Sequence, residues 1–144
     1  YRDFVFKDKD SCLRLFRRWA GQRKENNQDK VYQGMISDSK KSLDALLENY
    51  RKLNVCGKIV EINGRIKAFS FGFELGDNTF CILYEITDLT IKGLAQFIFS
   101  RFSQDLSKYK IINIMDDSGL ENLKRVKMSY RPIKLAPAYI ATRA

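Results

Sequence analysis

The residues best placed for proton-transfer chemistry lie at the end of a long apolar segment, residues 79–87 (TFCILYEIT). Glu85 interrupts this segment, and Asp88 follows directly after it. Such a segment predicts a central strand covered on both faces, where a carboxylate is costly unless it is paired or has a function. Because burial raises a carboxyl pKa, Glu85 is a candidate general base. Alternatively, Glu85 pairs with a neighbouring Lys or Arg, and Asp88 caps a helix.

The absence of histidine narrows this chemistry further. It excludes Ser-His-Asp and Cys-His nucleophiles and the HExxH metal motif. Proton transfer is then left to Glu, Asp, Tyr, Lys, the backbone or water. The cysteines Cys12, Cys56 and Cys81 lie in apolar surroundings without CxxC spacing, which indicates buried, reduced thiols in a cytosolic setting. We therefore expect no metal site.

A second group of candidates occupies residues 113–132 (NIMDDSGLENLKRVKMSYRP). An apolar strand is predicted to precede this segment, and an acidic turn leads from it into a basic helix. Ser118 and Glu121 have the spacing of a capping box at the start of that helix. Asn113 and Asp117 flank the turn, where they either position a substrate or satisfy the backbone of the turn itself.

The chain is strongly basic, with 26 Lys and Arg against 17 Asp and Glu and a net charge of +9. This charge favours polyanionic partners such as nucleotide phosphates, tRNA or an anionic lipid surface, although an ordinary basic protein has the same composition. The cations cluster in residues 14–24 and 124–134. No apolar run approaches the ~20 residues that cross a bilayer, and the charged N-terminus has no signal-peptide pattern.

Periodicity predicts an alternation of helices and strands in a single domain. Helical spacing of apolar residues begins near Ser11, and residues 21–38 are polar enough to be a loop that orders on binding. The Asn63-Gly64 pair is a strong hairpin signal. The further elements are a helix at 39–53, strands at 55–62, 65–75, 79–87 and 109–114, a helix from Ile91, a basic helix at 119–130 and a last strand at 133–140.

The 113–132 segment resembles the C-terminal signature of the phosphatidylglycerol lysyltransferase family, whose members have tandem GNAT-like acyltransferase folds. The resemblance extends back through Gly57, residues 63–69, Glu85, Asp88 and Gly93, which is about the last two thirds of the chain. It selects a GNAT-like α/β (α+β) fold with a mixed, partly antiparallel sheet flanked by helices. It also implies that residues 1–144 are one GNAT-like domain and the C-terminal half of a longer tandem protein with a preceding GNAT-like domain.

By this resemblance, the chain moves an aminoacyl group from aminoacyl-tRNA, or an acyl group from coenzyme A, to an amine or hydroxyl acceptor such as a phospholipid head group. The donor is a substrate, so no tightly bound cofactor is expected. Glu85 is the candidate base, and Tyr130 is either a proton donor or a core ring. The residues implied to hold the donor's phosphates are Lys92, Gly93, Leu94 and Ala95. The residues implied to contact substrate are Asp88, Asn113, Asp117, Lys124, Lys127 and Arg131.

Ile86, Ile114 and Met115 depart from the family pattern, and Thr90 stands where the usual acetyl-CoA turn of GNAT-like folds is preceded by Arg or Gln. They favour a second hypothesis, a non-catalytic GNAT-like half that binds RNA, an anionic surface or a partner domain. For either hypothesis we expect a cytoplasmic protein, held at the inner face of the membrane by segments outside this sequence.

Overall fold

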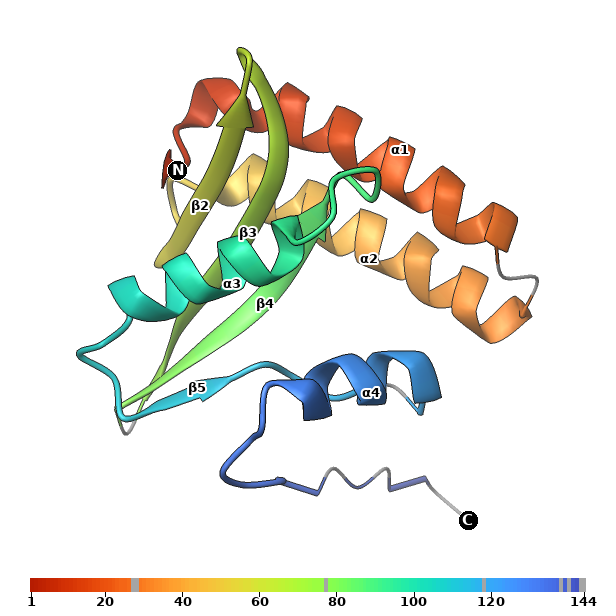
Figure 1. The fold of residues 1–144 in the computed structure, drawn as a ribbon, viewed down its shortest axis with the longest axis vertical. Coiled ribbons are helices and arrows are strands. Elements are labelled where there is room, and N and C mark those ends of the chain that lie inside the picture. The colour runs from red at the N-terminus through yellow and green to blue at the C-terminus, as the bar shows by residue number, and fades with distance from the viewer. Residues whose placement is uncertain (27–28, 77, 118, 138, 140, 143–144) are drawn as a thin grey trace. The chain divides into compact units, whose positions relative to one another are not determined.

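The computed structural model describes residues 1–26, 29–76, 78–117, 119–137, 139 and 141–142. The chain divides into two compact units, Tyr1–Asn113 and Ile114–Ala144, and each is described by itself. In the described residues, the first unit holds the β-sheet and helices α1 to α3, and the second holds helix α4 (Figure 1).

The sheet of the first unit has, in its described residues, five strands in the order β1-β2-β3-β4-β5. Strands β1 to β4 pair antiparallel with their neighbours, and β5 runs parallel to β4. A parallel pair needs a crossover connection, which helix α3 supplies. This mixed sheet flanked by helices confirms the predicted fold class. The bounds are β1 (Arg2–Asp3), β2 (Val55–Ile62), β3 (Arg65–Gly76), β4 (Thr79–Thr87), β5 (Ile111–Asn113) and α3 (Leu94–Asp105).

The turn between β2 and β3 sets the register of these strands. Asn63 and Gly64 have φ values of 51° and 70°. Positive φ at both positions gives a two-residue turn whose twist matches that of the flanking strands. Ile62 and Arg65 close the hairpin as a register pair. The predicted Asn-Gly hairpin is therefore confirmed.

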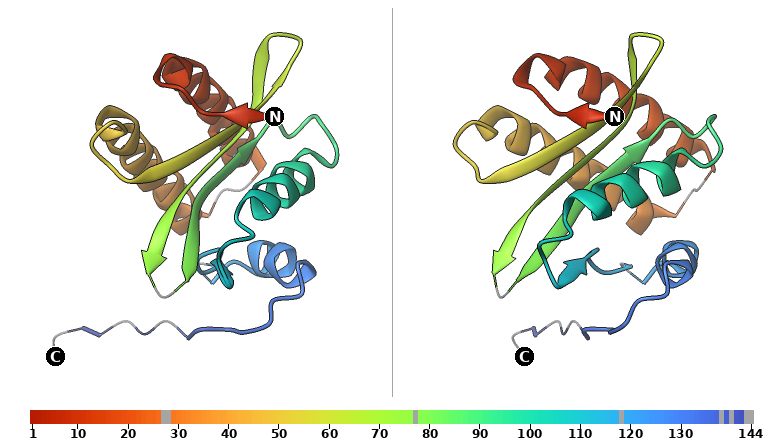
Figure 2. Two further views of the ribbon diagram at one scale, coloured as in Figure 1. Left: turned by 90° about the vertical axis from the view of Figure 1, so that its left-hand side faces the viewer. Right: turned by 60° about the vertical axis from the view of Figure 1, so that its left-hand side comes forward.

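Helices α1 (Lys9–Asn26) and α2 (Lys30–Asn49) cover one face of the sheet (Figure 2). Phe69 and Phe71 of β3 are fully buried in the core beneath them. The two rings lie 5.5 Å apart and contribute both apolar burial and aromatic contact. The helices add the buried residues Cys12, Leu15, Phe16, Leu43, Leu46 and Leu47 to this core.

The prediction of a loop at residues 21–38 is wrong, because α1 and α2 occupy most of that segment. The carboxylate of Asp29 accepts the backbone N–H of Tyr32 at 3.1 Å and so caps the start of α2. Tyr32 and Ile36 are buried and continue the apolar face of α2 toward Leu43 at helical spacing. The polar residues around them belong to the exposed face of a helix rather than to a loop.

Helix α3 covers the opposite face of the sheet (Figure 2). Leu94, Ile98 and Phe102 recur every fourth residue, and all three are buried. The first two pack on β2 and β3, and Phe102 packs on β4. The predicted helix is confirmed, although it begins at Leu94 rather than near Ile91.

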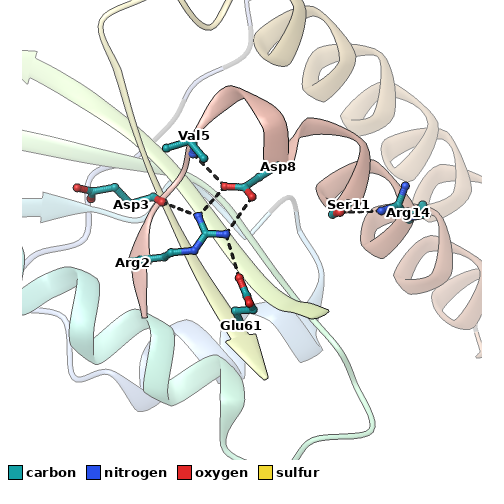
Figure 3. Close-up of polar contacts among 7 residues, drawn as sticks. All are labelled: Arg2, Asp3, Val5, Asp8, Ser11, Arg14 and Glu61. Carbon is teal, nitrogen blue, oxygen red and sulfur yellow. Dashed lines mark hydrogen bonds and ion pairs between the residues drawn. The ribbon is translucent and has the colours of Figure 1, made fainter. Parts of the chain in front are cut away.

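Arg2 joins strand β1 to two other segments (Figure 3). Its guanidinium donates to both carboxylate oxygens of Asp8, at 2.7 and 3.0 Å, and to Glu61 of β2 at 3.0 Å. Asp8 also accepts the backbone N–H of Val5 at 3.0 Å. The hydrogen bonds from Arg2 lower the pKa of Asp8. This bidentate ion pair between Arg2 and Asp8 fixes the 3₁₀ turn (Phe6–Asp8) that leads into α1.

In the second unit, helix α4 spans Glu121–Ser129. Its N-cap is Leu120, so Glu121 is the first helical residue rather than the third residue of a capping box. Ser118, the other predicted member of the box, lies outside the described residues. The carboxylate of Asp117 accepts the backbone N–H of Gly119 at 3.0 Å. This Asx turn occupies the position where the helix was expected to start.

The last strand, predicted at residues 133–140, is not found in the described part of that segment. Ile133 and Leu135 are 91% and 70% exposed, so their apolar alternation is not buried against a sheet. Pro137 has no N–H to donate to a strand ladder.

Candidate functional site

A β-bulge in β4 changes which of its side chains face each side of the sheet. Tyr84 pairs with Phe71 of β3, whereas the next β3 residue, Gly72, pairs with Ile82. Leu83 is therefore the extra residue of the bulge. Ile82 packs on the α3 side of the sheet, and Tyr84 packs on the side of α1 and α2.

The bulge brings Glu85 to the face that α3 covers. Ile86 packs with the core beneath α1 and α2, so strand alternation directs Glu85 to the opposite face. Glu85 is half-buried and pairs in register with Ser70 of β3. The candidate base thus lies on the same face of the sheet as α3, two residues before β4 ends at Thr87.

Strand β5 pairs along its whole length with only the first part of β4. Residues 79–81 of β4 pair with Ile111–Asn113, and β4 then continues to Thr87 beyond the last of these pairs. Within the described residues of the first unit, no strand pairs with this edge of β4 beyond Cys81. A strand edge without a neighbour presents backbone N–H and C=O groups to a ligand. Asn113, a predicted substrate contact, is the last residue of β5 and pairs with Cys81.

The turn between β4 and α3 exposes the amino end of that helix. Gly93 is the N-cap, with φ of 78° and no capping side chain. A Cβ added at Gly93 would meet nothing within 4 Å, and Lys92 beside it is exposed. The first N–H groups of a helix lack intrahelical acceptors, and with the helix dipole they attract anions. Buried Leu94 and half-buried Ala95 hold this first turn against the sheet.

Asp88 lies at the beginning of this turn, and both oxygens of its carboxylate accept hydrogen bonds from neighbouring residues. One carboxylate oxygen accepts the hydroxyl and the N–H of Thr90, at 2.7 and 3.1 Å. The other accepts the Lys67 ammonium at 2.8 Å, with the Arg18 guanidinium 3.8 Å away. The side chain of Asp88 is only 2% exposed. The hydrogen bonds from Lys67 and then Thr90 lower its pKa to about 2, so it is ionised at neutral pH.

Lys67 and Arg18 are the members of this cluster that sequence reasoning missed. Lys67 lies on β3, 21 residues before Asp88, and Arg18 lies on α1. The Asn63-Gly64 hairpin places Lys67 on β3, but its closeness to Asp88 also depends on the register of β4. The bulge shifts that register and leaves no clear mark in the sequence.

The predicted site residues of the second unit lie around α4. Asp117 forms the Asx turn before the helix, and the ammonium of Lys127 donates to the carbonyl oxygens of Ile114 and Asp116. Tyr130 is the C-cap of the helix. Lys127 and Asp117 thus fix the entry to α4. Two further predicted residues are exposed in this unit: Lys124 and Arg131.

A cavity of about 310 Å³ lies at the other end of α3, away from Gly93. Its walls include Lys58, Asp105 and Tyr109, and half-buried Cys56 also lines it. Burial raises the pKa of the Cys56 thiol, which keeps it protonated and unreactive at neutral pH.

Comparisons with solved structures identify the fold. A conserved protein of unknown function from Bacteroides thetaiotaomicron superposes with a TM-score of 0.82 at 27% identity, covering 93% of this chain and 44% of that one. Ribosomal-protein-alanine N-acetyltransferase from Brucella melitensis superposes with a TM-score of 0.67 at 10% identity, covering 99% and 98%. PaiA N-acetyltransferase from Thermoplasma acidophilum, solved with coenzyme A, gives 0.60 at 11% identity, covering 90% and 85%. The chain therefore has the GNAT acyltransferase fold.

The sequence itself gives the family. Residues 2–142 match the family described as "Phosphatidylglycerol lysyltransferase, C-terminal", so the chain belongs to that family. No curated protein matched the sequence. The chain spans less than half the length of the Bacteroides protein. None of the helices formed by the described residues is both long and apolar enough to cross a membrane.

Proposed function

We propose that this chain is a transferase module that takes an acyl or aminoacyl group from a phosphate-bearing donor. The observation that carries the proposal is the open amino end of α3 at Gly93, together with the edge of β4 beyond Cys81, where β5 has ended. Such an arrangement suits an extended donor. Its phosphates accept hydrogen bonds from the helix amides, and its chain follows the free edge of β4.

The chemistry proposed for this donor is attack by an amine or hydroxyl on its carbonyl carbon. Glu85 takes the proton of the attacking group, because it lies on the α3 face near the end of β4. The new C–N or C–O bond forms as the thioester C–S bond of acyl-CoA, or the ester C–O bond of aminoacyl-tRNA, breaks. The leaving thiolate or ribose oxygen takes up a proton, for which Tyr130 is the candidate donor. The remaining catalysis is positioning and stabilisation of developing charge.

The family favours aminoacyl-tRNA as donor and a phospholipid head group as acceptor, and the neighbour solved with coenzyme A favours acyl-CoA as the alternative donor. A ligand screen distinguishes the two. Coenzyme A, unacylated tRNA and vesicles containing anionic lipid are each added to the protein, and the unfolding temperature is measured. A ligand that binds only the folded state raises that temperature. If none of the three raises it, the proposed function is wrong.

The second candidate function is a non-catalytic half that binds RNA or an anionic surface. It is supported by Ile86, which departs from the expected family pattern and is buried in the core. A binding module would show affinity for tRNA or anionic vesicles that falls steeply with salt, without transfer. Transfer of a labelled group to an amine or hydroxyl acceptor would exclude this alternative.

A further inference from the structure

We propose that Asp88 is the positioning residue of the β4–α3 turn: it acts through Thr90 and Lys67 to hold the α3 amides in the arrangement that receives the donor's phosphates. The inference rests on the proposed function and deepens it. It concerns how the phosphate site is kept in shape, rather than which groups touch the donor.

Hydrogen bonds centred on Asp88 fix the turn residue by residue. Its own N–H donates to the Lys67 carbonyl at 2.7 Å, which ties the end of β4 to β3. Its carbonyl accepts the Ile91 N–H at 3.1 Å, and its carboxylate accepts both donors of Thr90. The Ile91 carbonyl accepts the Leu94 N–H at 3.4 Å. A continuous series of hydrogen bonds, the longest of them 3.4 Å, therefore joins the sheet to the first helical residue.

Burial separates Asp88 from a direct role in ligand contact. At 2% exposure its side chain is closed to a ligand, and both oxygens already accept hydrogen bonds. A bare carboxylate close to an anion site would also repel phosphate. The ammonium of Lys67, 2.8 Å away and itself only 20% exposed, offsets that charge. The pair therefore gives rigidity to the turn without adding net negative charge to it.

Asp88→Asn is the informative substitution because it keeps the shape of the side chain. Whichever way the Asn amide is turned, its NH₂ group faces either the Lys67 ammonium or the Thr90 N–H, and both are donors. The turn must then shift to relieve that clash. The half-buried ammonium of Lys67 also loses its counter-ion, which is unfavourable because that ammonium is partly desolvated.

Asp105, the last residue of α3, provides a matched control. It pairs with Lys58 at 2.8 Å, as Asp88 pairs with Lys67, and Asp105→Asn makes the same change of charge. It lies at the carboxyl end of α3, which is roughly 18 Å along a twelve-residue helix from Gly93. A general effect of losing one carboxylate would appear in both variants.

The experiment measures affinity for coenzyme A and for pantetheine, which lacks the pyrophosphate, together with hydrogen exchange at the amides of residues 90–96. For Asp88→Asn we expect coenzyme A binding to weaken between about 10- and 100-fold, pantetheine binding to stay the same and the turn amides to exchange faster. Asp105→Asn should match the wild type in all three. If Asp88→Asn does not fold, Thr90→Val removes one hydrogen bond from the turn and should change the three readouts in the same direction by less.

Three results would overturn the role of Asp88: unchanged exchange of the turn amides, an equal loss of affinity for both ligands, or an equal loss in the Asp105→Asn variant. Failure of the proposed function has a different signature. In that case the wild type binds no phosphate-bearing donor, while the exchange measurement still shows whether Asp88 holds the turn.

Discussion

A lysine–aspartate ion pair lies near each end of helix α3, but the two pairs differ in burial and in their surroundings. Asp88 pairs with Lys67 before the helix, and Asp105 pairs with Lys58 at its end, both at 2.8 Å. Asp88 is buried at 2% exposure, whereas Asp105 is 38% exposed. The amino end is open at Gly93, and the carboxyl end adjoins the 310 Å³ cavity.

This comparison indicates that a cavity beside a lysine–carboxylate pair does not by itself define an anion-binding site. The carboxyl end of a helix presents carbonyl oxygens, and its dipole repels anions, even where a cavity is present. The amino end presents N–H groups. Helix polarity, rather than the size of the cavity, is therefore the reason for proposing the phosphate site at Gly93.

The largest expected effect is on catalysis. Glu85→Gln should lower the rate of transfer by about 10²- to 10⁴-fold, because the base can no longer take up a proton. The measurement is a single-turnover transfer assay at saturating donor. Glu74→Gln is the matched control, since Glu74 accepts the Tyr109 hydroxyl at 2.9 Å near the other end of α3. An unchanged rate in the Glu85 variant would remove that residue from the mechanism.

Gly93→Ala should weaken the binding of a phosphate-bearing donor more than about tenfold, because the left-handed backbone at φ 78° is strained by a Cβ and the helix amides move. Calorimetric titration with coenzyme A measures the loss. Gly64→Ala introduces a similar strain at φ 70° in the β2–β3 hairpin. Both variants should lose about 1–2 kcal/mol of stability, and only the first should lose affinity. Equal affinities would place the donor elsewhere.

The stability contributed by Asp88 should depend on pH. Its folded-state pKa of about 2 is below the ordinary 3.8, so its contribution is complete above pH 3.8 and is lost as the pH falls through about 2. The pH-dependent difference in unfolding free energy between wild type and Asp88→Asn should reach about 2 kcal/mol at pH 6 and shrink toward pH 2. Urea titrations across this range measure it. A difference that does not vary with pH would contradict an ionised Asp88.

The smallest effect is expected at Arg18. Its guanidinium lies 3.8 Å from Asp88 and is 51% exposed, so solvent screens the pair. Arg18→Gln should change stability by less than about 0.5 kcal/mol, whereas Lys67→Gln should cost several times more. Thermal unfolding of the two variants tests the difference. Equal losses would mean that Arg18 shares the anchoring of the turn.

Features with local causes could be predicted from the sequence. The Asn63-Gly64 hairpin follows from two residues that accept positive φ. The apolar face of α3 follows from Leu94, Ile98 and Phe102 at helical spacing. The span of β4 agrees with its predicted residues, 79–87. The beginning of α2 was missed because its buried residues, Tyr32 and Ile36, lie in a segment that is otherwise rich in polar residues, although Asp29 is a capping residue.

Features that depend on distant partners could not be predicted. The Lys67–Asp88 pair joins residues 21 positions apart, and its formation requires a register that the bulge at Leu83 has shifted. The end of α4 nearest Asp117 was also misplaced, because the Asx turn competes with the expected capping box.

By itself, the sequence excluded catalysis that depends on histidine, the side chain that most often serves as a general base, because the chain has none. It also determined most of the elements, because turn residues and apolar spacing act over a few positions. Only the tertiary structure decided that Glu85 lies on the α3 face of the sheet, that β4 extends beyond its pairing with β5 and that Asp88 is buried against Lys67. These features arise where strands and helices far apart in sequence meet, and their energies come from contacts that no short segment contains.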